Sequence, residues 1–279
     1  MTDIGTHPEP RMQARQAPQM QNGHPAPAPD FGVDISIVMP CLNEEAAVAR
    51  CVETALSGIR ASGMTGEVLV VDNDSTDGSA KLAAAAGARI VREPVRGYGQ
   101  AYLAGLAEAR GRFIVLGDSD GTYDFATVGS FVEPLTNGTD LVMGSRLRGT
   151  IDRGAMPWLH RYLGNPLLTK TVNLLFSNQI SDVYCGMRSV KHEALSRMTL
   201  SATGMEFALE MIISAERNGM RIKEVPIRYR RRVGGTPKLR TWRDGWRSLR
   251  FIVAESRGSH SASIQVMPSV SSAPSESSP

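Results

Sequence analysis

The sequence predicts an α/β protein with a mostly parallel central sheet that is covered by helices on both faces. Short apolar runs of strand length alternate with segments whose apolar residues recur at helical spacing. Apolar strands separated by helices are typical of a parallel sheet that is buried on both sides. The length of 279 residues, the 42% hydrophobic content and the 21% charged content suit a globular protein with a sizeable core.

The predicted sheet begins with two apolar strands and the helix between them. Residues 35–40 (ISIVMP) form the first strand-like run. Residues 44–56 follow with helical spacing, and Asn43 precedes them as an expected N-cap, a position where asparagine is favoured. Residues 67–72 (EVLVVD) then predict the second strand.

Two more helices flank a third strand. Residues 76–87 predict a helix that ends at Gly87, because glycine readily adopts the left-handed conformation found after many helices. Residues 88–91 (ARIV) form the third strand-like run. The alanine-rich residues 98–111 predict a further helix, which again ends at a glycine, Gly111.

The last two predicted strands lie at residues 112–118 (RFIVLGD) and 139–146 (TDLVMGSR). Composition sets the outer limits of the folded domain. Residues 1–32 are rich in Pro, Gln and Ala, and residues 257–279 are rich in Ser, so neither segment has enough apolar surface to fold alone. We therefore expect one domain over residues 33–256 between two disordered tails.

Acidic side chains crowd the ends of the predicted strands. In FIVLGDSDGTYDF an apolar run is followed at once by Asp118, Asp120 and Asp124. Ligands of parallel sheets bind at the carboxyl ends of the strands. Carboxylates that lie close together repel each other unless a cation or a proton relieves them, and hard divalent cations prefer oxygen ligands. The pattern predicts a divalent metal site that holds a phosphorylated ligand, although Asp118 and Asp120 also fit a simple turn with Gly121.

Charge and cysteine content narrow the class of protein. The net charge of +3 identifies no partner, but residues 221–250 are strongly basic and are opposed only by Glu224 and Asp244, which indicates a phosphate ligand. Three cysteines at this spacing fit neither a zinc site nor a disulfide framework. We expect no signal peptide and no transmembrane helix, since no apolar run reaches the required length.

Successive motifs carry a family resemblance. SIVMPCLNEE, VVDNDSTDGS and GDSDGTYD are followed by DLVMGSRLRG, SDVYCGMRSVKHEAL, GMEFALEMIISA and EVPIRYRRRVGGTPKLRTWRDG. Over nearly all of residues 34–250 these motifs resemble family 2 glycosyltransferases, which have the GT-A fold. The subgroup they resemble most is the dolichyl- or polyprenyl-phosphate sugar synthases. The resemblance implies a GT-A nucleotide-diphospho-sugar transferase fold and an inverting, metal-dependent transfer of glucose or mannose from a nucleotide sugar to a lipid phosphate.

The resemblance also implies a donor site. DSD, residues 118–120, stands at the family's DXD motif, so Asp120 would be the catalytic metal ligand, and Asp118 would contact the ribose or the metal, Mg²⁺ or Mn²⁺. Where the family often has Gly-x-Ser-Lys-Leu, this chain has GGTPKL. The other residues implied to bind the donor are Pro40, Leu42, Asn43, Glu44, Asp72, Asp74, Gly97, Gln100, Arg232 and Lys238.

For the acceptor, the resemblance implies that Arg146, as a catalytic residue, and Arg148 face the phosphate. Arg188 would bind the same phosphate or pair with Asp182, which would order the acceptor loop. Glu206 would act as a base toward a hydroxyl acceptor, or would lie on a solvated helix face.

Two amphipathic stretches offer places for a lipid. Residues 156–176 carry apolar residues at near-helical spacing, and residues 238–255 combine a tryptophan stripe with arginines one position further on. Such a helix suits an anionic membrane surface. Alternatively, the stripe docks on the domain while the arginines extend to solvent. We expect a cytoplasmic protein that associates peripherally with the cytoplasmic face of the membrane.

The expected partners are UDP-glucose or GDP-mannose, polyprenyl phosphate and a membrane surface. One alternative is the same fold with a soluble acceptor or a growing glycan. A nucleotidyltransferase is disfavoured because the loop after the first strand, PCLNEE, is acidic rather than basic. A nucleic-acid-binding module is disfavoured because acidic strand ends would repel a phosphate backbone.

Overall fold

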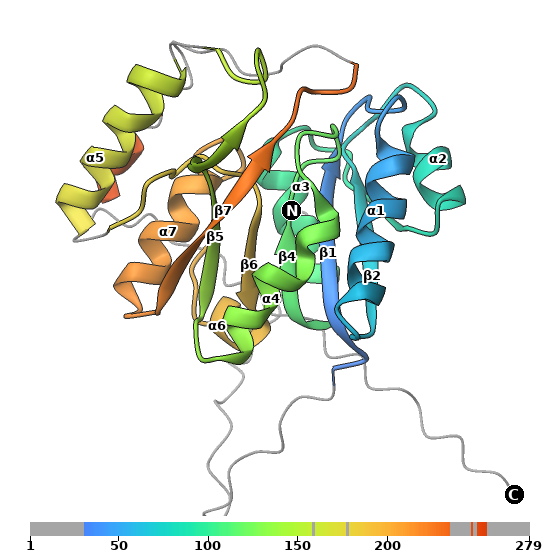
Figure 1. Ribbon diagram of the computed structural model, residues 1–279, viewed down its shortest axis with the longest axis horizontal. Helices are drawn as coiled ribbons and strands as arrows, with labels where there is room; N and C mark the ends of the chain where they lie inside the picture. Colours follow the sequence, from blue (N-terminus) through green and yellow to red (C-terminus); the bar gives the residue numbers. More distant parts are fainter. Residues whose placement is uncertain (1–30, 158–159, 177–178, 235–246, 248–249, 256–279) are drawn as a thin grey trace, which may run out of the picture. The chain divides into compact units, whose positions relative to one another are not determined.

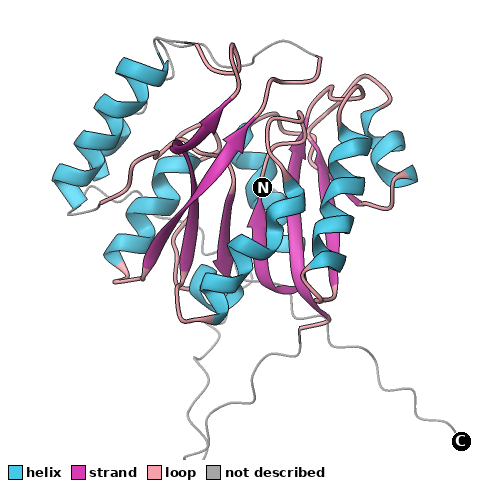
Figure 2. Cartoon of the chain, viewed as in Figure 1, coloured by secondary structure: helices cyan, strands magenta, loops and turns pink. Residues whose placement is uncertain are grey.

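The computed structural model describes residues 31–157, 160–176, 179–234, 247 and 250–255. Within this part of the chain, one seven-stranded sheet has the order β3-β2-β1-β4-β6-β5-β7 (Figures 1 and 2). All neighbouring strands are parallel except that β6 runs antiparallel to both β4 and β5. The predicted α/β class with a mostly parallel sheet is confirmed. The strands are β1 (Val33–Cys41), β2 (Gly66–Asp72), β3 (Arg89–Arg92), β4 (Gly111–Leu116), β5 (Leu141–Ile151), β6 (Arg188–Lys191) and β7 (Ile222–Tyr229).

Helices cover both faces of the sheet, as Figure 2 shows. A short 3₁₀ helix (Phe125–Thr127) precedes α4, and a π-helix (His160–Gly164) runs directly into α5. The α-helices are α1 (Val48–Ala61), α2 (Ser79–Ala85), α3 (Tyr98–Glu108), α4 (Val128–Thr136), α5 (Asn165–Phe176), α6 (His192–Leu195) and α7 (Phe207–Arg217).

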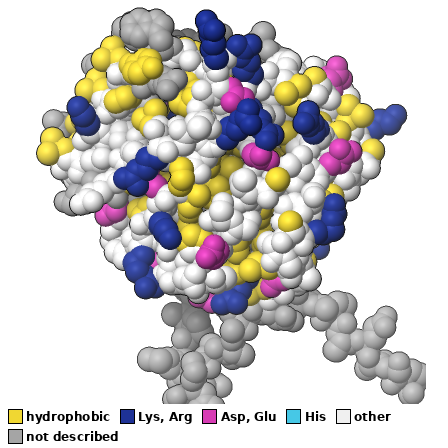
Figure 3. Space-filling view, viewed as in Figure 1, with side chains coloured by type: hydrophobic (Ala, Val, Ile, Leu, Met, Phe, Trp, Pro, Cys, Tyr) yellow, Lys and Arg dark blue, Asp and Glu magenta, His cyan; other side chains and the backbone are white. Residues whose placement is uncertain are grey.

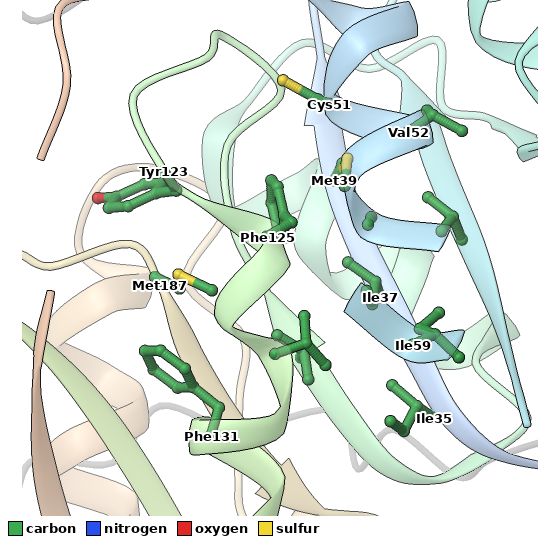
Figure 4. Close-up of a cluster of buried hydrophobic side chains, with 14 of the residues drawn as sticks. Ile35, Ile37, Met39, Cys51, Val52, Ile59, Tyr123, Phe125, Phe131 and Met187 are labelled. Carbon is green, nitrogen blue, oxygen red and sulfur yellow. The ribbon is translucent and has the colours of Figure 1, made fainter. Parts of the chain in front are cut away.

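The alternation of side chains along each strand divides the core into two clusters. Ile35, Ile37 and Met39 of β1 face α1 and α4, and Figure 4 shows them along the side of α1 that carries Val52 and Ile59. The intervening residues of β1 and β4 point to the opposite face, where they pack with side chains of α3, α6 and α7. Because both faces are buried, the sheet is rigid and its strand ends have fixed positions.

Strand register brings three loops together at one edge of the sheet. Cys41, the last residue of β1, pairs with Asp72, the last residue of β2. Val38 pairs with Leu116 at the end of β4, and the Ser119 hydroxyl donates a hydrogen bond to the Pro40 carbonyl at 2.7 Å. The loops that follow β1, β2 and β4 therefore lie side by side, as the sequence predicted.

Several helix and strand bounds differ from prediction. The first helix begins at Val48 rather than residue 44, and Asn43 is not its N-cap. The third ends at Glu108, because Ala109 is extended. The fifth strand continues to Ile151. Strands β6 and β7 were not predicted.

The predicted C-terminal helix is described only in part. Arg247 and residues 250–255 are helical. Ile252 is fully buried in the second cluster, and Phe251 packs against that cluster. This end of the helix therefore packs on the domain, but Val253, which is half-buried, is the sole member of the predicted apolar stripe among the described residues, so docking of the stripe stays a prediction. The tryptophans of the stripe and Lys238 lie outside the described residues.

Candidate active site

Arg232 connects three segments that are far apart in the sequence. Its Nη1 donates to Asp120 Oδ2 at 2.7 Å, and its Nη2 donates to the carboxylate of Glu44. The backbone N–H of Val233 also donates to the Asp120 carbonyl at 3.0 Å. Arg232 follows β7, Glu44 follows β1 and Asp120 follows β4. The structure thus brings the predicted basic segment directly against the acidic strand ends.

The two aspartates of the DSD motif have different surroundings. Asp120 is 8% exposed, and its Oδ1 accepts hydrogen bonds from the backbone N–H and the hydroxyl of Thr122 at 3.0 and 2.6 Å. Asp118 is half-buried, and Tyr102 donates to its Oδ1 at 3.3 Å. Burial raises the pKa of Asp118 most, and the negative charge of Asp120 raises it further, to about 7. The hydrogen bonds from Tyr98 and Tyr102 act in the opposite direction.

The donor set of this pair fits a hard divalent cation. Both side chains offer carboxylate oxygens, and the mutual repulsion that raises the Asp118 pKa would be relieved by a positive charge. Among the described residues, no group of three or more His, Cys, Asp or Glu side chains is arranged to hold a metal ion. Two carboxylates suffice where a phosphorylated ligand completes the coordination, as is usual for Mg²⁺.

The loops after β1 and β2 contain strained backbone at predicted donor-binding positions. Asn43 (φ 55°) and Asp74 (φ 65°) are the non-glycine residues with positive φ in the described chain. Asn43 Oδ1 accepts from the Thr76 N–H at 2.8 Å, and Arg96 Nε donates to Asp74 at 2.9 Å. Such conformations are uncommon, and they persist where surrounding contacts enforce them, often at functional sites. The predicted residues Pro40, Leu42 and Asp72 belong to the same pair of strand ends.

Asn73 was not predicted as a site residue, yet it places the predicted Gly97 and Gln100. Its amide nitrogen donates to the carbonyls of Glu93 and Val95, and its oxygen accepts from the Gly97 N–H at 2.8 Å. Gln100 in turn donates to the Glu93 carboxylate at 3.1 Å. The start of α3 is therefore tied to the end of β2. The sequence signal that could have identified Asn73 is its amide side chain between two aspartates in VDNDST.

On the other side of the carboxylates, β5 carries the two predicted arginines. Arg146 makes a bidentate ion pair with Asp182, with Nε–Oδ2 and Nη2–Oδ1 distances of 2.7 Å. Burial opposes ionisation, but the charge and hydrogen bonds of Arg146 lower the pKa of Asp182 overall. Arg148 Nη1 lies 3.3 Å from Glu224 Oε2, and its side chain is 57% exposed. Asp182 lies in the segment before β6. That it orders a loop that binds the acceptor stays a prediction.

The expectation that Arg188 binds the acceptor phosphate is wrong. Its side chain is 2% exposed, and it donates to the carbonyls of Val183, Cys185 and Ala208. It does not pair with Asp182, whose carboxylate faces Arg146. Burial lowers the pKa of Arg188. Arg188 therefore ties the loop before β6 to helix α7, and its guanidinium is not available to a ligand.

The two glutamates at the start of α7 do not lie on a solvated face. Glu210 is buried and accepts hydrogen bonds from the backbone N–H groups of Ser201 and Ala202. Glu206 pairs with Arg247, with an Oε1–Nε distance of 2.7 Å. A base role for Glu206 stays a prediction, and in this geometry a guanidinium occupies its carboxylate.

The sheet is mostly parallel, and its strand ends bring together paired carboxylates, strained loops and an arginine that follows the last strand. These features define a transferase of nucleotide sugars with GT-A architecture. The comparisons with known proteins agree. The family model described as Glycosyl transferase family 2 matches residues 36–199. The chain belongs to this family, and it is a glycosyltransferase.

Several curated proteins resemble the chain. A low-salt glycan biosynthesis hexosyltransferase (Agl6) of Haloferax volcanii is 42% identical over 230 residues, which is 82% of this chain but 55% of that protein's own length. An uncharacterized glycosyltransferase of Mycobacterium tuberculosis is 32% identical over 75% of this chain and 90% of its own length. A dolichyl-phosphate hexose transferase of Haloferax volcanii is 32% identical over 73% of this chain and 86% of its own length.

Solved structures give the same fold. The glucosyl-3-phosphoglycerate synthase of Mycobacterium tuberculosis superposes with a TM-score of 0.63 and 25% identity over 81% of both chains. That enzyme has been crystallised with Mn²⁺, UDP-glucose and phosphoglyceric acid, and with Mg²⁺ and UDP.

Proposed function

We propose that this glycosyltransferase moves a hexose from UDP-glucose or GDP-mannose to a polyprenyl phosphate and inverts the anomeric centre. The observation that carries the lipid acceptor is an exposed apolar face on the π-helix and α5, the first helical segments after the strand with Arg146 and Arg148. The relative named a dolichyl-phosphate hexose transferase supports the same acceptor class.

The apolar face is made of exposed side chains on the π-helix and α5. Helix α5 buries Asn165, Thr169 and Val172 against the domain. Its other side exposes large apolar side chains, with Leu174 83% exposed, and Figure 3 shows hydrophobic side chains gathered over this helix. Exposed apolar side chains gathered on one helical segment are typical of a site that contacts a lipid or another protein. The exposed residues are Tyr162, Leu163, Leu167, Leu174 and Leu175.

The structure describes no helix that combines the length and apolarity needed to cross a bilayer. The exposed leucines of α5 lead us to propose contact with the membrane surface through the face of this helix.

The chemistry suits a phosphate acceptor. A phosphomonoester is anionic at neutral pH, so its oxygen attacks the anomeric carbon without a strong general base. The new bond is the one from that oxygen to the anomeric carbon. The bond from the anomeric carbon to the donor diphosphate breaks, and the nucleoside diphosphate leaves with the electron pair. The main requirement is therefore to neutralise the leaving group.

We assign roles to the described residues on this basis. Asp118 and Asp120 would hold Mg²⁺ or Mn²⁺, which supplies positive charge to the leaving diphosphate when bound. Arg232, already at Asp120, would donate to the same diphosphate. Arg146 and Arg148 would attract the acceptor phosphate. The divalent metals in the glucosyl-3-phosphoglycerate synthase crystals support the first assignment.

A soluble phosphorylated acceptor is the second candidate. Its support is the glucosyl-3-phosphoglycerate synthase fold, which has been crystallised with phosphoglyceric acid. The two arginines on β5 would suit the phosphate of either acceptor, whereas the apolar face of α5 would serve only a lipid.

A transfer assay tests both candidates. The protein is incubated with Mg²⁺ or Mn²⁺, each nucleotide sugar in turn, and either a short polyprenyl phosphate or phosphoglyceric acid. We expect glycolipid from one donor, and no product with chelator or with Asp120→Ala. Product only from the soluble acceptor, or donor hydrolysis without any lipid product, would refute the lipid acceptor.

A further inference from the structure

Glu224 of β7 is a nearly buried carboxylate that contacts two other segments. Its side chain is 4% exposed. Oε1 accepts hydrogen bonds from the backbone N–H groups of Ser181 and Asp182 at 2.7 and 3.3 Å, and the Ser181 hydroxyl lies 3.0 Å from each carboxylate oxygen. Oε2 lies 3.3 Å from Arg148 Nη1. One carboxylate therefore joins the loop before β6 to the exposed arginine of β5.

A second set of contacts closes the same network. The Ser145 hydroxyl lies 2.7 Å from that of Ser181, and it accepts a hydrogen bond from the backbone N–H of Arg148 at 3.0 Å. The backbone N–H of Arg148 is thus linked to Ser181 through the Ser145 hydroxyl, and its guanidinium contacts Glu224. Bonds to a charged carboxylate are stronger than neutral ones, and low exposure strengthens them further.

The network reaches Arg146 as well. Asp182, which holds the Arg146 guanidinium, is itself held through its backbone N–H by Glu224. The two arginines lie two residues apart on β5, and each is paired with a carboxylate from another segment. The acidic partners compensate the arginines before any ligand binds, and the exposed guanidinium of Arg148 keeps donors free to turn toward an anion.

We infer that Glu224 is a positioning residue for acceptor binding, which sets the direction of Arg148 and, through Asp182, that of Arg146 toward an incoming phosphomonoester. Glu224 does not itself touch the acceptor. The inference rests on the proposed function for the identity of the acceptor. An arginine held in place by a buried carboxylate loses less rotamer freedom when it binds than a free one does.

Steady-state kinetics with Glu224→Gln test the inference. The amide keeps the size of the side chain and one oxygen for Ser181, but it removes the charge that faces Arg148. We expect the KM for polyprenyl phosphate to rise by roughly tenfold or more, as for the loss of a charge-assisted hydrogen bond. The KM for the nucleotide sugar should stay within about twofold, because Glu44, Asp118 and Asp120 follow other strands and the Arg232 guanidinium is held by Asp120 and Glu44, not by Glu224.

Four further variants sharpen the result. Arg148→Ala, at an exposed side chain, should raise the same KM, and the double variant should show much less than the product of the two effects. Ser181→Ala removes a single hydroxyl from the network and keeps the test open if Glu224→Gln folds poorly. The matched control is Glu67→Gln, which removes a carboxylate bonded to Ser36 and Arg89 near the start of β2. It should lower the melting temperature without changing either KM.

Equal changes in both KM values, or a loss of stability alone, would show that Glu224 is only structural. If the wild type transfers nothing to polyprenyl phosphate, the proposed function fails, and binding then decides the inference. Calorimetry with a short prenyl monophosphate and with glycerol 3-phosphate needs no turnover. Weaker binding of either probe to Glu224→Gln than to wild type supports the inference. Equal binding, or no binding to wild type, overturns it.

Discussion

Two arginines in adjacent motifs have different roles, and only their partners distinguish them. Arg146 is neutralised by a bidentate carboxylate, whereas Arg188 is held by three backbone carbonyls. Both were expected to face the acceptor phosphate, so the sequence offered no reason to separate them. The partner of each depends on how β5, β6 and α7 come together, which is a property of the tertiary structure.

The ion pair of Arg146 gives a prediction about stability. Asp182→Asn leaves a buried guanidinium without its counter-charge, which should lower the free energy of unfolding by about 3–5 kcal/mol at neutral pH. Since the folded-state pKa of Asp182 is lowered, its stabilisation is present above the unfolded pKa of about 4 and is lost as the pH falls through the folded value. The difference between wild type and variant should therefore shrink in acid.

Chemical denaturation at a series of pH values measures this difference. Asp152→Asn is a suitable control, because Asp152 pairs with Arg228 at an exposed position and should change stability by less than about 1 kcal/mol. A difference between wild type and Asp182→Asn that stayed constant from neutral pH into strong acid would contradict the assignment.

Much of the donor side of the site was predictable from residues. The crowded aspartates indicated a site at the strand ends, and Glu44, Asp120 and Arg232 do converge there. Asn43 was expected as a helix cap because asparagine is common there; the structure instead places it in a left-handed turn that binds the β2 loop. Glu224 was not predicted as a site residue because its role depends on partners 42 and 43 residues away.

At the level of elements, apolar strands were predicted, the four-residue β3 included, and polar ones were not. All five predicted strands exist. The two missed strands are β6, whose RSVK sequence has a single large apolar residue, and β7, which contains Pro226 and alternating charges. A four-residue strand with a single large apolar residue has too little local signal, and only the position of β6 between β4 and β5 makes it a strand. A proline within β7 fits its place at the edge of the sheet.

Helix α5 gives a prediction about membrane contact. Replacing Leu167 and Leu174 with glutamate should leave folding intact, because both side chains are exposed. Each lost leucine contact should weaken binding to polyprenyl-phosphate-containing vesicles by roughly tenfold or more, as expected for about 1.5–3 kcal/mol per buried leucine. Vesicle sedimentation measures the binding.

Leu82→Glu is the matched control for these variants, since Leu82 is an exposed leucine on α2. It should bind vesicles as the wild type does. Metal-dependent hydrolysis of the nucleotide sugar, which needs no lipid, should be the same in all of these proteins. Unchanged vesicle binding of the double variant would refute the contact of α5 with the membrane.

For the whole molecule, the site connects distant parts of one sheet. Arg232 follows the edge strand β7, and its two acidic partners follow the central strands β1 and β4, 188 and 112 residues away in the sequence. A ligand bound at these strand ends therefore contacts both halves of the sheet.

Arg232→Gln tests this connection. Loss of a charged hydrogen bond, worth about 1.5–3 kcal/mol, should weaken nucleotide-sugar binding by roughly ten- to a hundredfold. Titration calorimetry with UDP-glucose and GDP-mannose measures the affinity. Arg228→Gln, which removes an arginine of the same strand that pairs with Asp152, should bind the donor as tightly as the wild type. If Arg232→Gln bound the nucleotide sugar as tightly as Arg228→Gln, the donor diphosphate would not lie at Arg232.

The antiparallel strand β6 has a consequence for the order in which the protein folds. Strands β1 to β4 follow one another through short helical crossovers and can pair as they are synthesised. Strand β5 cannot join them, because the place beside β4 belongs to β6, which comes later in the chain. The sheet can be completed only when Arg188–Lys191 returns after the long segment that contains α5. Such non-local pairing is slow, and until it occurs β4 has an open edge at which nascent chains can associate.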